Sequence, residues 1–311
     1  MPAIATLTLN PTIDVAYEVE RIVPTHKIRT SREYYNPGGG GINVARVFVR
    51  LGGNARCIYL SGGATGAAFD GLLDLHQLVR TRIAIAGPTR IALDALEHAS
   101  GKEYRFTPAG PTVSEAEWTA GLEAIERTPC EWLVASGSLP PGMPADFYAT
   151  LSLRLAARGV PLVLDTSGEA LRQGLAGGGI ALVKPSRGEL EALVGRKLAS
   201  VAAIAEAAAG IVAAGQARIV ATTLGHEGAV LTHAGGSVHA PALDIAAQSA
   251  VGAGDSFVAG MVFALAGGMA VEEAFRHGVA AGSAAVLRAG TDLARAEDVA
   301  RLLPQVRLVQ A

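Results

Sequence analysis

Short apolar runs alternate with helix-like patterns along most of this chain. The runs end at turn-forming residues and are short enough to be buried strands; they are Ile4 to Leu9, Arg56 to Leu60, Trp132 to Ala135, Pro161 to Leu164, Ala181 to Val183 and Arg218 to Ala221. Helical patterns are found at Gly41 to Leu51, Ala116 to Ile125, Pro144 to Ala157, Gly188 to Val194, Val201 to Ala214, Gly254 to Ala266, Val271 to Leu287 and Ala296 to Leu303. Such alternation predicts an α/β fold, in which helices cover both faces of a mostly parallel sheet.

Two stretches break this alternation. Residues Asp14 to Tyr35 alternate polar and apolar side chains, and Ile91 to Phe106 is typical of a hairpin with its turn at Ala99 to Lys102. Strands buried on one face predict a small, separate sheet. We expect that sheet to cover the carboxyl edge of the main one, where open α/β folds bind ligands.

Composition excludes several other classes. The mass of 31.7 kDa fits one large α/β domain with a small appendage, or two ordinary domains. The formal net charge is −2, from 26 basic and 28 acidic residues, so no nucleic-acid partner is expected. No uninterrupted apolar run reaches the roughly 18 residues of a membrane span, so no membrane partner is expected. Cys57 and Cys130 lie in neither metal nor redox spacing, which favours a reducing cytoplasm.

The segment from Ser249 to Phe257 carries the strongest chemical signal. Gly252, Ala253 and Gly254 precede an apolar helix, whose first N–H groups suit an anion. Asp255 lies among those donors, where it can accept a proton from a hydroxyl while the donors hold a transferring phosphoryl group. The alternative is that Asp255 only caps the helix.

A second glycine cluster runs from Asn36 to Arg46. Consecutive glycines allow the main chain to approach a polar ligand, and Asn43, one turn into the following helix, suits sugar hydroxyls. The alternative is a flexible loop with a solvated Asn43. A dinucleotide site is disfavoured, because Asn43 stands where the third glycine of that motif belongs.

Three further loops follow strands. Ser136 to Gly142 forms a turn that offers Ser138 to a ligand, although an isolated turn of this kind is more often structural. Lys184 to Glu189 suits ATP phosphates and a magnesium water shell, or simply an acidic helix start. Thr222 to Gly228 suits a nucleotide or a hairpin loop equally.

These five segments, in this order, resemble those of the ribokinase/PfkB-type sugar kinases, and within them the PfkB-type 6-phosphofructokinase subgroup. The similarity runs from Thr6 to Ala285. It implies a ribokinase-like three-layer α/β/α core in a single domain, residues 1–311. It also implies a β lid at about 14–35 and 88–108 that pairs two subunits into a homodimer. ATP and Mg²⁺ are the implied cofactors.

The resemblance also implies roles for individual residues. Asp255 would be the general base, with Gly252, Ala253 and Gly254 as its anion hole. Sugar hydroxyls would meet Asp14, Gly39, Gly40 and Asn43. The sugar's phosphate would meet Lys27, Arg29, Arg90 and Ser138, with Lys27 reaching into the neighbouring subunit. ATP would be bordered by Lys184, Ser186, Thr223, Gly225, Gly228 and Gly282, with Glu189 near magnesium.

The implied reaction is transfer of a phosphoryl group from ATP to fructose 6-phosphate. Three cations on or beside the expected lid, Lys27, Arg29 and Arg90, independently favour a phosphorylated substrate. The alternatives are tagatose-6-phosphate kinase, 1-phosphofructokinase and a non-catalytic sugar-phosphate sensor. The sensor is disfavoured because Asp255 and its glycines are intact.

Two positions depart from the family pattern. Ser186 stands where the magnesium segment usually has Asn, and its shorter side chain cannot reproduce an amide contact. Ala250 replaces a threonine beside the loop at which relatives bind potassium. The second change argues against activation by a monovalent cation.

Overall fold

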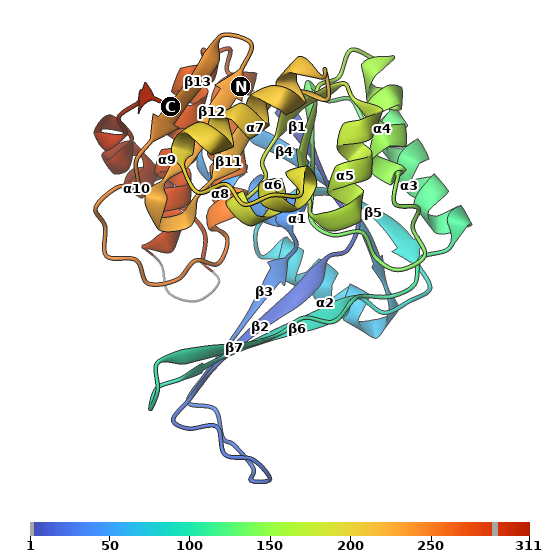
Figure 1. Cartoon of the computed structure of the whole chain (residues 1–311). Helices are drawn as coiled ribbons and strands as arrows, with labels where there is room; N and C mark the ends of the chain where they lie inside the picture. Colours follow the sequence, from blue (N-terminus) through green and yellow to red (C-terminus); the bar gives the residue numbers. More distant parts are fainter. Residues whose placement is uncertain (1–2, 288–291) are drawn as a thin grey trace.

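The computed structural model describes residues 3–287 and 292–311. Its middle layer is a 10-stranded sheet (Figure 1). In spatial order the strands are β14 (Val309–Gln310), β13 (Gly236–Ala240), β12 (Ala229–His233), β11 (Ala217–Thr223), β10 (Ile180–Val183), β9 (Leu162–Asp165), β8 (Trp132–Ser136), β1 (Ala3–Thr8), β4 (Asn54–Gly62) and β5 (Val79–Ile85). The predicted mostly parallel α/β sheet is therefore confirmed.

The central strand β1 pairs in parallel with β4 on one side and β8 on the other. The chain first builds the sheet toward β5 and then returns to build it toward β11. A sheet whose strand order reverses in this way opens a crevice at the carboxyl ends of its central strands. The ladders from β11 to β14 are antiparallel and lie at the far edge.

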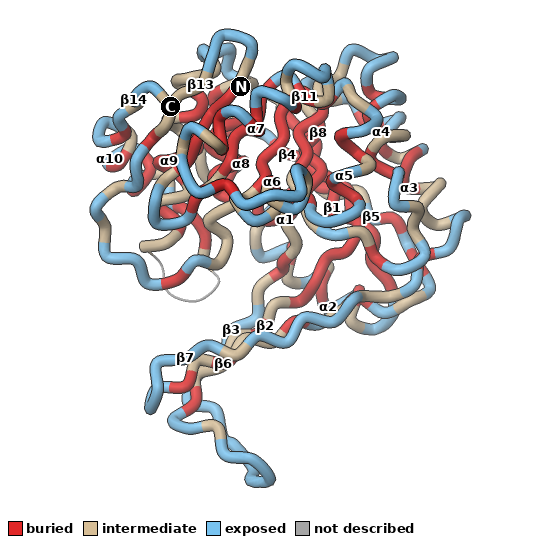
Figure 2. Tube along the Cα trace, in the orientation of Figure 1, coloured by how far each residue is buried: buried red, intermediate tan, exposed pale blue. Residues whose placement is uncertain are grey.

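Helices cover both faces of the sheet, and each face has its own apolar core. One layer holds α1 (Gly40–Arg50), α2 (Gly63–Asp74), α8 (Ala253–Ala266), α9 (Val271–Val286) and α10 (Ala296–Leu302). The other holds α3 (Glu115–Arg127), α4 (Phe147–Ala156), α5 (Gly168–Gly177), α6 (Arg187–Val194) and α7 (Val201–Ala213). Two 3₁₀ turns, η1 (Gly225–Glu227) and η2 (Leu303–Gln305), complete the order. Buried residues follow the strands and the inner helix faces (Figure 2).

The predicted strands and helices all occur, within a few residues at each end. The sequence analysis missed β5, β12, β13 and β14, together with α2 and α5. Strands such as β5 and β13 lie toward the sheet edges and carry exposed or half-buried residues, so they lack the continuous apolar run that marks a central strand.

A separate 4-stranded sheet projects from the main body (Figures 1 and 2). Its order is β3 (Arg32–Gly38), β2 (Thr12–Val19), β6 (Arg90–Glu97) and β7 (Lys102–Phe106), and we call it the lid. The hairpin turn at 98–101 lies where it was predicted. Residues 20–31 form a loop instead of continuing the strand alternation, since Pro24 lacks an N–H and Thr25 has a positive φ of 64°.

The first turn of α1 lies directly against β1. A Cβ atom added at Gly41 would stand 2.6 Å from the carbonyl oxygen of Leu7 and 2.5 Å from the hydroxyl of Thr8. Leu7 is held by ladders on both sides and cannot yield. Only glycine therefore allows α1 to start where it does.

We expect Gly41→Ala to lower the free energy of unfolding by about 1–3 kcal/mol, because the added methyl group overpacks a rigid contact. Urea unfolding measures this change. The matched control is Gly210→Ala, an exposed helical site where an added Cβ meets nothing within 4 Å. That control should be more stable by about 0.4–1 kcal/mol. Equal stability of both variants would contradict the overpacking argument.

Among the described residues, no helix is long and apolar enough to cross a bilayer.

Candidate active site

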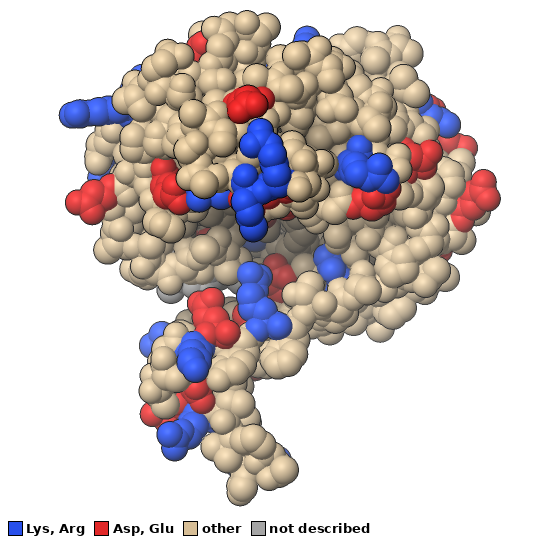
Figure 3. All heavy atoms as spheres, viewed as in Figure 1, with Lys and Arg blue, Asp and Glu red and all other residues tan. Residues whose placement is uncertain are grey.

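Two adjoining cavities open at the carboxyl edge of the parallel strands. The first, about 380 Å³, is lined mainly by polar residues from the lid, the glycine cluster and the ends of β8 and β9. The second, about 560 Å³, is mostly apolar and lies between α8, α9 and the η1 loop. The start of α8 forms the shared wall: Gly252 and Asp255 face the first cavity, while Ala253 and Gly254 face the second. Figure 3 shows a hollow between lid and body with charged side chains along its rims.

Gly252, not Asp255, holds the N-cap position of α8. Its φ of 72° lies in the left-handed region, which glycine adopts without strain. Asp255 is the third residue of the helix, so the capping alternative is wrong. The side chain of Asp255 thus stays free to face the cavity beside N–H groups that carry partial positive charge.

Asp255 receives a hydrogen bond from the amide of Asn43, with 2.9 Å between Nδ2 and Oδ2. Burial raises the pKa of Asp255 to about 7, and the nearby carboxylate of Asp165 adds to the rise. The Asn43 bond and the ammonium of Lys184 act in the opposite direction. A carboxylate with a pKa near neutrality is suited to take a proton from a hydroxyl.

We expect kcat/KM for the sugar to fall as the pH drops below about 7, approaching a tenfold loss per pH unit. The reason is that protonated Asp255 can no longer accept the hydroxyl proton. Steady-state rates between pH 5 and 9 give the profile. The residual activity of Asp255→Asn should lack this ascending limb. A flat profile for the unaltered enzyme down to pH 5 would contradict the assignment.

The sugar-binding candidates of the glycine cluster lie together. Gly39, Gly40 and Asn43 line the first cavity, and Asp14 faces them from β2. Burial raises the pKa of Asp14 to about 6, and Asp94 adds to the rise while Arg105 opposes it. Hydroxyl groups of a ligand here would find carboxylate and amide partners on two sides.

Asp165 was missed by the sequence analysis. It ends β9, lines the first cavity, and pairs with Lys184 at 3.1 Å between Oδ1 and Nζ. Both side chains are largely buried, and Ser136 donates a further bond to Asp165 at 3.3 Å. Lys184 lies against the start of α8, since its Nζ would be 3.5 Å from a Cβ atom on Gly254. The sequence did contain a signal for Asp165, which is the acidic residue that ends the buried strand Leu162–Asp165.

Arg105 was also missed. It comes from lid strand β7, lines the first cavity, and its Nε donates to Asp94 at 2.7 Å. The lid therefore brings a cation to the side of the cavity opposite the main body.

Arg90 and Ser138 lie together where the first cavity meets an adjoining hollow. Both line an adjoining hollow of about 550 Å³, and Ser138 also lines the first cavity. Arg90 donates to the carbonyl oxygens of Asn10 and Pro108, at 2.8 and 2.9 Å. The Asn10 amide donates to the hydroxyl oxygen of Ser138 at 3.2 Å, which leaves that hydroxyl free to donate to a ligand.

Lys27 and Arg29 are not brought to this site in their own chain. They lie on the exposed lid loop at 20–31 and line a separate hollow of about 300 Å³ with other residues of that loop.

The second cavity contains most of the residues expected at the nucleotide. Ser186, Thr223, Gly225, Gly228 and Gly282 all line it, together with apolar residues such as Leu243, Ile245, Val279 and Val286. The segment Thr222 to Gly228 is also the loop between antiparallel β11 and β12, so it both forms a hairpin and lines the cavity. Lys184 lies beside the wall between the cavities.

Glu189 faces the first cavity and forms a capping box with Ser186 at the start of α6. Its Oε2 accepts from the backbone N–H of Ser186 at 2.7 Å. Ser186 thus has a definite role in fixing the acid. No cluster of three or more metal-ligating side chains occurs within the described ranges. A Mg²⁺ ion needs only one or two carboxylates beside phosphate oxygens and water, so Glu189 suits that use.

Comparison with known proteins decides the family. The family model of pfkB family carbohydrate kinases matches residues 7–298. The chain belongs to the pfkB family. This pfkB protein is therefore an ATP-dependent carbohydrate kinase with the α/β fold that its motifs predicted.

Its pfkB relatives cover nearly the whole chain. The ATP-dependent 6-phosphofructokinase isozyme 2 of Escherichia coli is 40% identical over 97% of this chain and 98% of that protein. The crystal structure of phosphofructokinase-2 from Escherichia coli in complex with fructose-6-phosphate gives a TM-score of 0.92 at 38% identity, over 98% of this chain and 99% of that one. Arabidopsis thaliana ribokinase shares the fold, with a TM-score of 0.78 at 22% identity over 97% and 98%.

Proposed function

We propose that this enzyme transfers the γ-phosphoryl group of ATP to the C1 hydroxyl of fructose 6-phosphate, forming fructose 1,6-bisphosphate. The observation that carries the proposal is the wall shared by the two cavities. Asp255 faces the polar cavity, while Gly254 beside it faces the apolar one. A hydroxyl bound in the first and a phosphate entering from the second would meet across the start of α8, as an in-line transfer requires.

Each group would then have a simple task. Asn43, Asp14, Gly39 and Gly40 would hold the sugar hydroxyls. Asp255 would remove the proton from the attacking hydroxyl, and the N–H groups of Ala253 and Gly254 would hold the transferring phosphoryl oxygens. The apolar side chains of the second cavity would cover the adenine, with Thr223, Gly225, Gly228 and Gly282 at its border. Lys184 would lie closest to the transferred group.

Mg²⁺ fits the acidic groups that face the first cavity, Glu189 and Asp165. We assign Glu189 to its water shell, since the capping bond from Ser186 fixes that carboxylate. When bound, the ion would neutralise charge on the ATP phosphates. A potassium requirement is not part of the proposal, because Ala250 offers no side-chain oxygen where the family has threonine.

A phosphorylated sugar is favoured by the cations at the far end of the first cavity. Arg105 lines it directly, and Arg90 and Ser138 lie at its adjoining hollow. A phosphate dianion accepts charge-assisted hydrogen bonds from such groups, whereas a neutral sugar offers these cations no anionic partner.

The test is a kinetic panel with ATP and one acceptor at a time: fructose 6-phosphate, tagatose 6-phosphate, fructose 1-phosphate and unphosphorylated fructose. We expect the highest kcat/KM for fructose 6-phosphate. Fructose 1-phosphate as the best acceptor would overturn the proposed C1 transfer. Sugar binding without ATP consumption would instead support a sensor. Arg90→Ala should raise KM for the phosphosugar by about tenfold or more, as loss of a hydrogen bond to a charged group does.

We further propose a single-domain subunit that forms a homodimer through its lid, so that Lys27 and Arg29 serve the partner's site. Their position on the 20–31 loop, away from their own cavity, supports this arrangement. So do exposed apolar side chains on the lid strands: Tyr34, Tyr35, Ile91 and Phe106. The reaction is assigned to the cytoplasm, in keeping with the unpaired Cys57 and Cys130.

Phe106→Glu is expected to dissociate the dimer at micromolar concentration, because a charge would replace a side chain that is 61% exposed in the single subunit. Light scattering after size exclusion measures this. Lys27→Ala should keep the dimer but raise KM for the phosphosugar about ten- to a hundredfold. The control is Val309→Glu on edge strand β14, which is exposed outside the lid. A stable Phe106→Glu dimer with normal KM would exclude a lid interface.

A further inference from the structure

The first turns of α1 contain a buried cation whose purpose the proposed chemistry does not explain. Arg46 is only 4% exposed, and the carboxylates of Asp292 and Asp14 act on its guanidinium from a distance, without forming an ion pair with it among the described residues. A buried charge without a direct counter-ion is expensive and persists only where fixed hydrogen bonds hold it. Its contacts should therefore reveal what it holds.

Two oxygens accept from Nη1 of Arg46. One is the carbonyl oxygen of Pro37 at 3.1 Å, which comes directly before the four consecutive glycines Gly38 to Gly41. The other is Oδ1 of Asn43 at 3.3 Å, one turn earlier on the same helix. Nε is buried and has no partner among the described residues. The guanidinium thus donates hydrogen bonds to the residue before the glycines and to a single side-chain amide.

That amide is the one that binds the catalytic carboxylate. Asn43 offers one carbonyl oxygen and one NH₂ group, which point in opposite directions. Its NH₂ donates to Asp255 at 2.9 Å while its oxygen accepts from Arg46. If the amide flipped, NH₂ would face a guanidinium that has no acceptor, and oxygen would face a carboxylate. Both contacts would then be repulsive.

We propose that Arg46 is a positioning residue for the catalytic base: its guanidinium fixes the Asn43 amide so that this amide always donates to Asp255. The inference rests on the proposed role of Asp255, and it assigns to Arg46 a function through Asn43 with no substrate contact of its own. In the same way, the bond to Pro37 holds the glycine loop at the distance that Asn43 requires.

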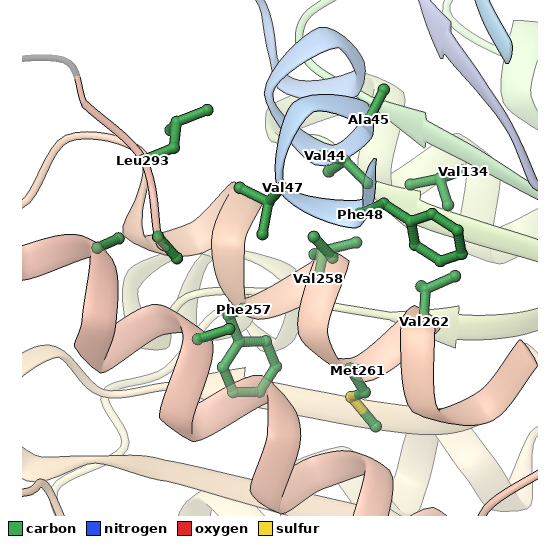
Figure 4. Packing of buried hydrophobic residues seen from close by; sticks show 14 of the residues in the cluster. Val44, Ala45, Val47, Phe48, Val134, Phe257, Val258, Met261, Val262 and Leu293 are labelled. Carbon is green, nitrogen blue, oxygen red and sulfur yellow. The ribbon is translucent and has the colours of Figure 1, made fainter. Parts of the chain in front are cut away.

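The frame around this chain of bonds is rigid. Helix α1 packs along α8 through apolar side chains, among them Val47, Phe48, Val258 and Val262 (Figure 4). The rings of Phe48 and Phe263 meet edge to face with centroids 5.6 Å apart. This packing fixes the backbone positions of Arg46, Asn43 and Asp255 relative to one another, so the orientation of the Asn43 amide is the remaining variable.

Other charged groups surround Asp255 and Arg46, the two ends of this series of hydrogen bonds. Asp165 on β9, Lys184 directly after β10 and Asp14 on β2 act on Asp255, and Arg50, Asp292, Asp14 and His76 lie around Arg46. Burial lowers the pKa of Arg46 to about 10, so it stays charged at neutral pH. Arg46 also lowers the pKa of Asp14, although less than Arg105 and Arg90 do. An Asn43→Ala background separates this indirect effect from the loss of the hydrogen bond between Arg46 and Asn43.

The decisive measurement is the titration of Asp255 in the free enzyme, by NMR of the enzyme labelled with ¹³C at aspartate Cγ. The Asp255 signal is assigned by its absence in Asp255→Asn. In Arg46→Met we expect the midpoint to rise by about one pH unit, because a freely turning amide no longer stabilises the carboxylate. This readout needs no turnover, so it stays informative if the kinase proposal fails.

The rise in the Asp255 midpoint should also change how kcat/KM depends on pH. With a one-unit rise, kcat/KM of Arg46→Met should fall about fivefold at pH 7 and return close to that of the unaltered enzyme at pH 9. A purely structural defect would lower the rate equally at all pH values. The matched control is Arg50→Met, one turn along the same helix, whose guanidinium binds Leu293, Ala294 and Asp292. It should leave the Asp255 midpoint unchanged.

Two further variants keep the proposal falsifiable. Arg46→Lys retains the buried charge on a single donor nitrogen, so it should shift the midpoint in the same direction by less. This variant decides the matter if Arg46→Met does not fold. In an Asn43→Ala background, Arg46→Met should cause no additional shift. An unchanged midpoint in either folded Arg46 variant, or a full shift in the Asn43→Ala background, would overturn the proposal.

Discussion

Asp255→Asn is expected to reduce kcat by about 10²- to 10⁴-fold, the usual contribution of a general base. Asparagine fills the same space and can still accept the hydrogen bond from Asn43, but it cannot take up a proton. The sugar and ATP should therefore bind with nearly unchanged affinity. Initial rates at saturating substrates, together with a binding titration, separate the two effects.

The same substitution should make the protein more stable at high pH. Burial raises the pKa of Asp255 to about 7, whereas in the unfolded chain it lies near 3.9. Between these values the folded state binds more protons, so its stability falls as the pH rises through this window. At pH 8 the ionised side chain lowers stability by on the order of 2 to 4 kcal/mol. A neutral amide at this position would remove that penalty.

Thermal unfolding at pH 8 and pH 5 tests this signature. Asp255→Asn should melt higher than the unaltered enzyme at pH 8, and the difference should shrink toward pH 5. Asp244→Asn, at an exposed acid of the preceding loop, serves as the control and should show neither change. Normal turnover in Asp255→Asn would remove this carboxylate from the mechanism. Lower stability at pH 8 would show that the side chain is not buried as a charge.

The sequence predicted those parts of the site that depend on local signals. Gly252, Asp255 and Asn43 stand in glycine loops that lead into helices, where both the turn and the exposed N–H groups follow from neighbouring residues. Parallel strands then bring such loops to one edge of the sheet. Motif position along the chain was therefore enough to place these residues together.

Asp165 and Arg105 were missed because their roles depend on distant partners. Asp165 matters through Lys184, which becomes its neighbour only by the pairing of β9 with β10. Arg105 lies on a short lid strand with no buried residue on either face, so alternation does not indicate which face lines a cavity. Arg46 likewise resembles any helical arginine until its burial and its contact with Asn43 are known.

Replacing Lys184 by Met is expected to lower the free energy of unfolding by about 3–5 kcal/mol at pH 8, because it leaves the carboxylate of Asp165 buried without its cation. Lys184 and Asp165 are 3.1 Å apart, with side chains only 7% and 14% exposed. Burial already raises the pKa of Asp165, and Lys184 is the main group that opposes this rise. Without Lys184, folding at pH 8 requires either a buried unpaired charge or proton uptake by Asp165.

Proton uptake gives the prediction its pH dependence. As the pH falls, Asp165 of the folded variant binds a proton, so the stability deficit of Lys184→Met should shrink. Turnover should stay low at every pH, because Lys184 also lies beside Gly254, in the proposed anion hole. Urea unfolding at pH 8 and pH 5.5 measures the first effect, and saturating rates measure the second.

A double substitution separates the loss of the pair from the loss of packing. Asp165→Asn combined with Lys184→Met removes both charges and should recover most of the stability that Lys184→Met loses, while catalysis stays impaired. The control is Lys197→Met at the pair with Glu191, where the lysine side chain is 90% exposed and solvent screens the charges. That variant should unfold at nearly the parental urea concentration. If the double variant were as unstable as Lys184→Met alone, the lysine would stabilise the fold through its hydrocarbon stem, and the ion pair would contribute nothing to stability.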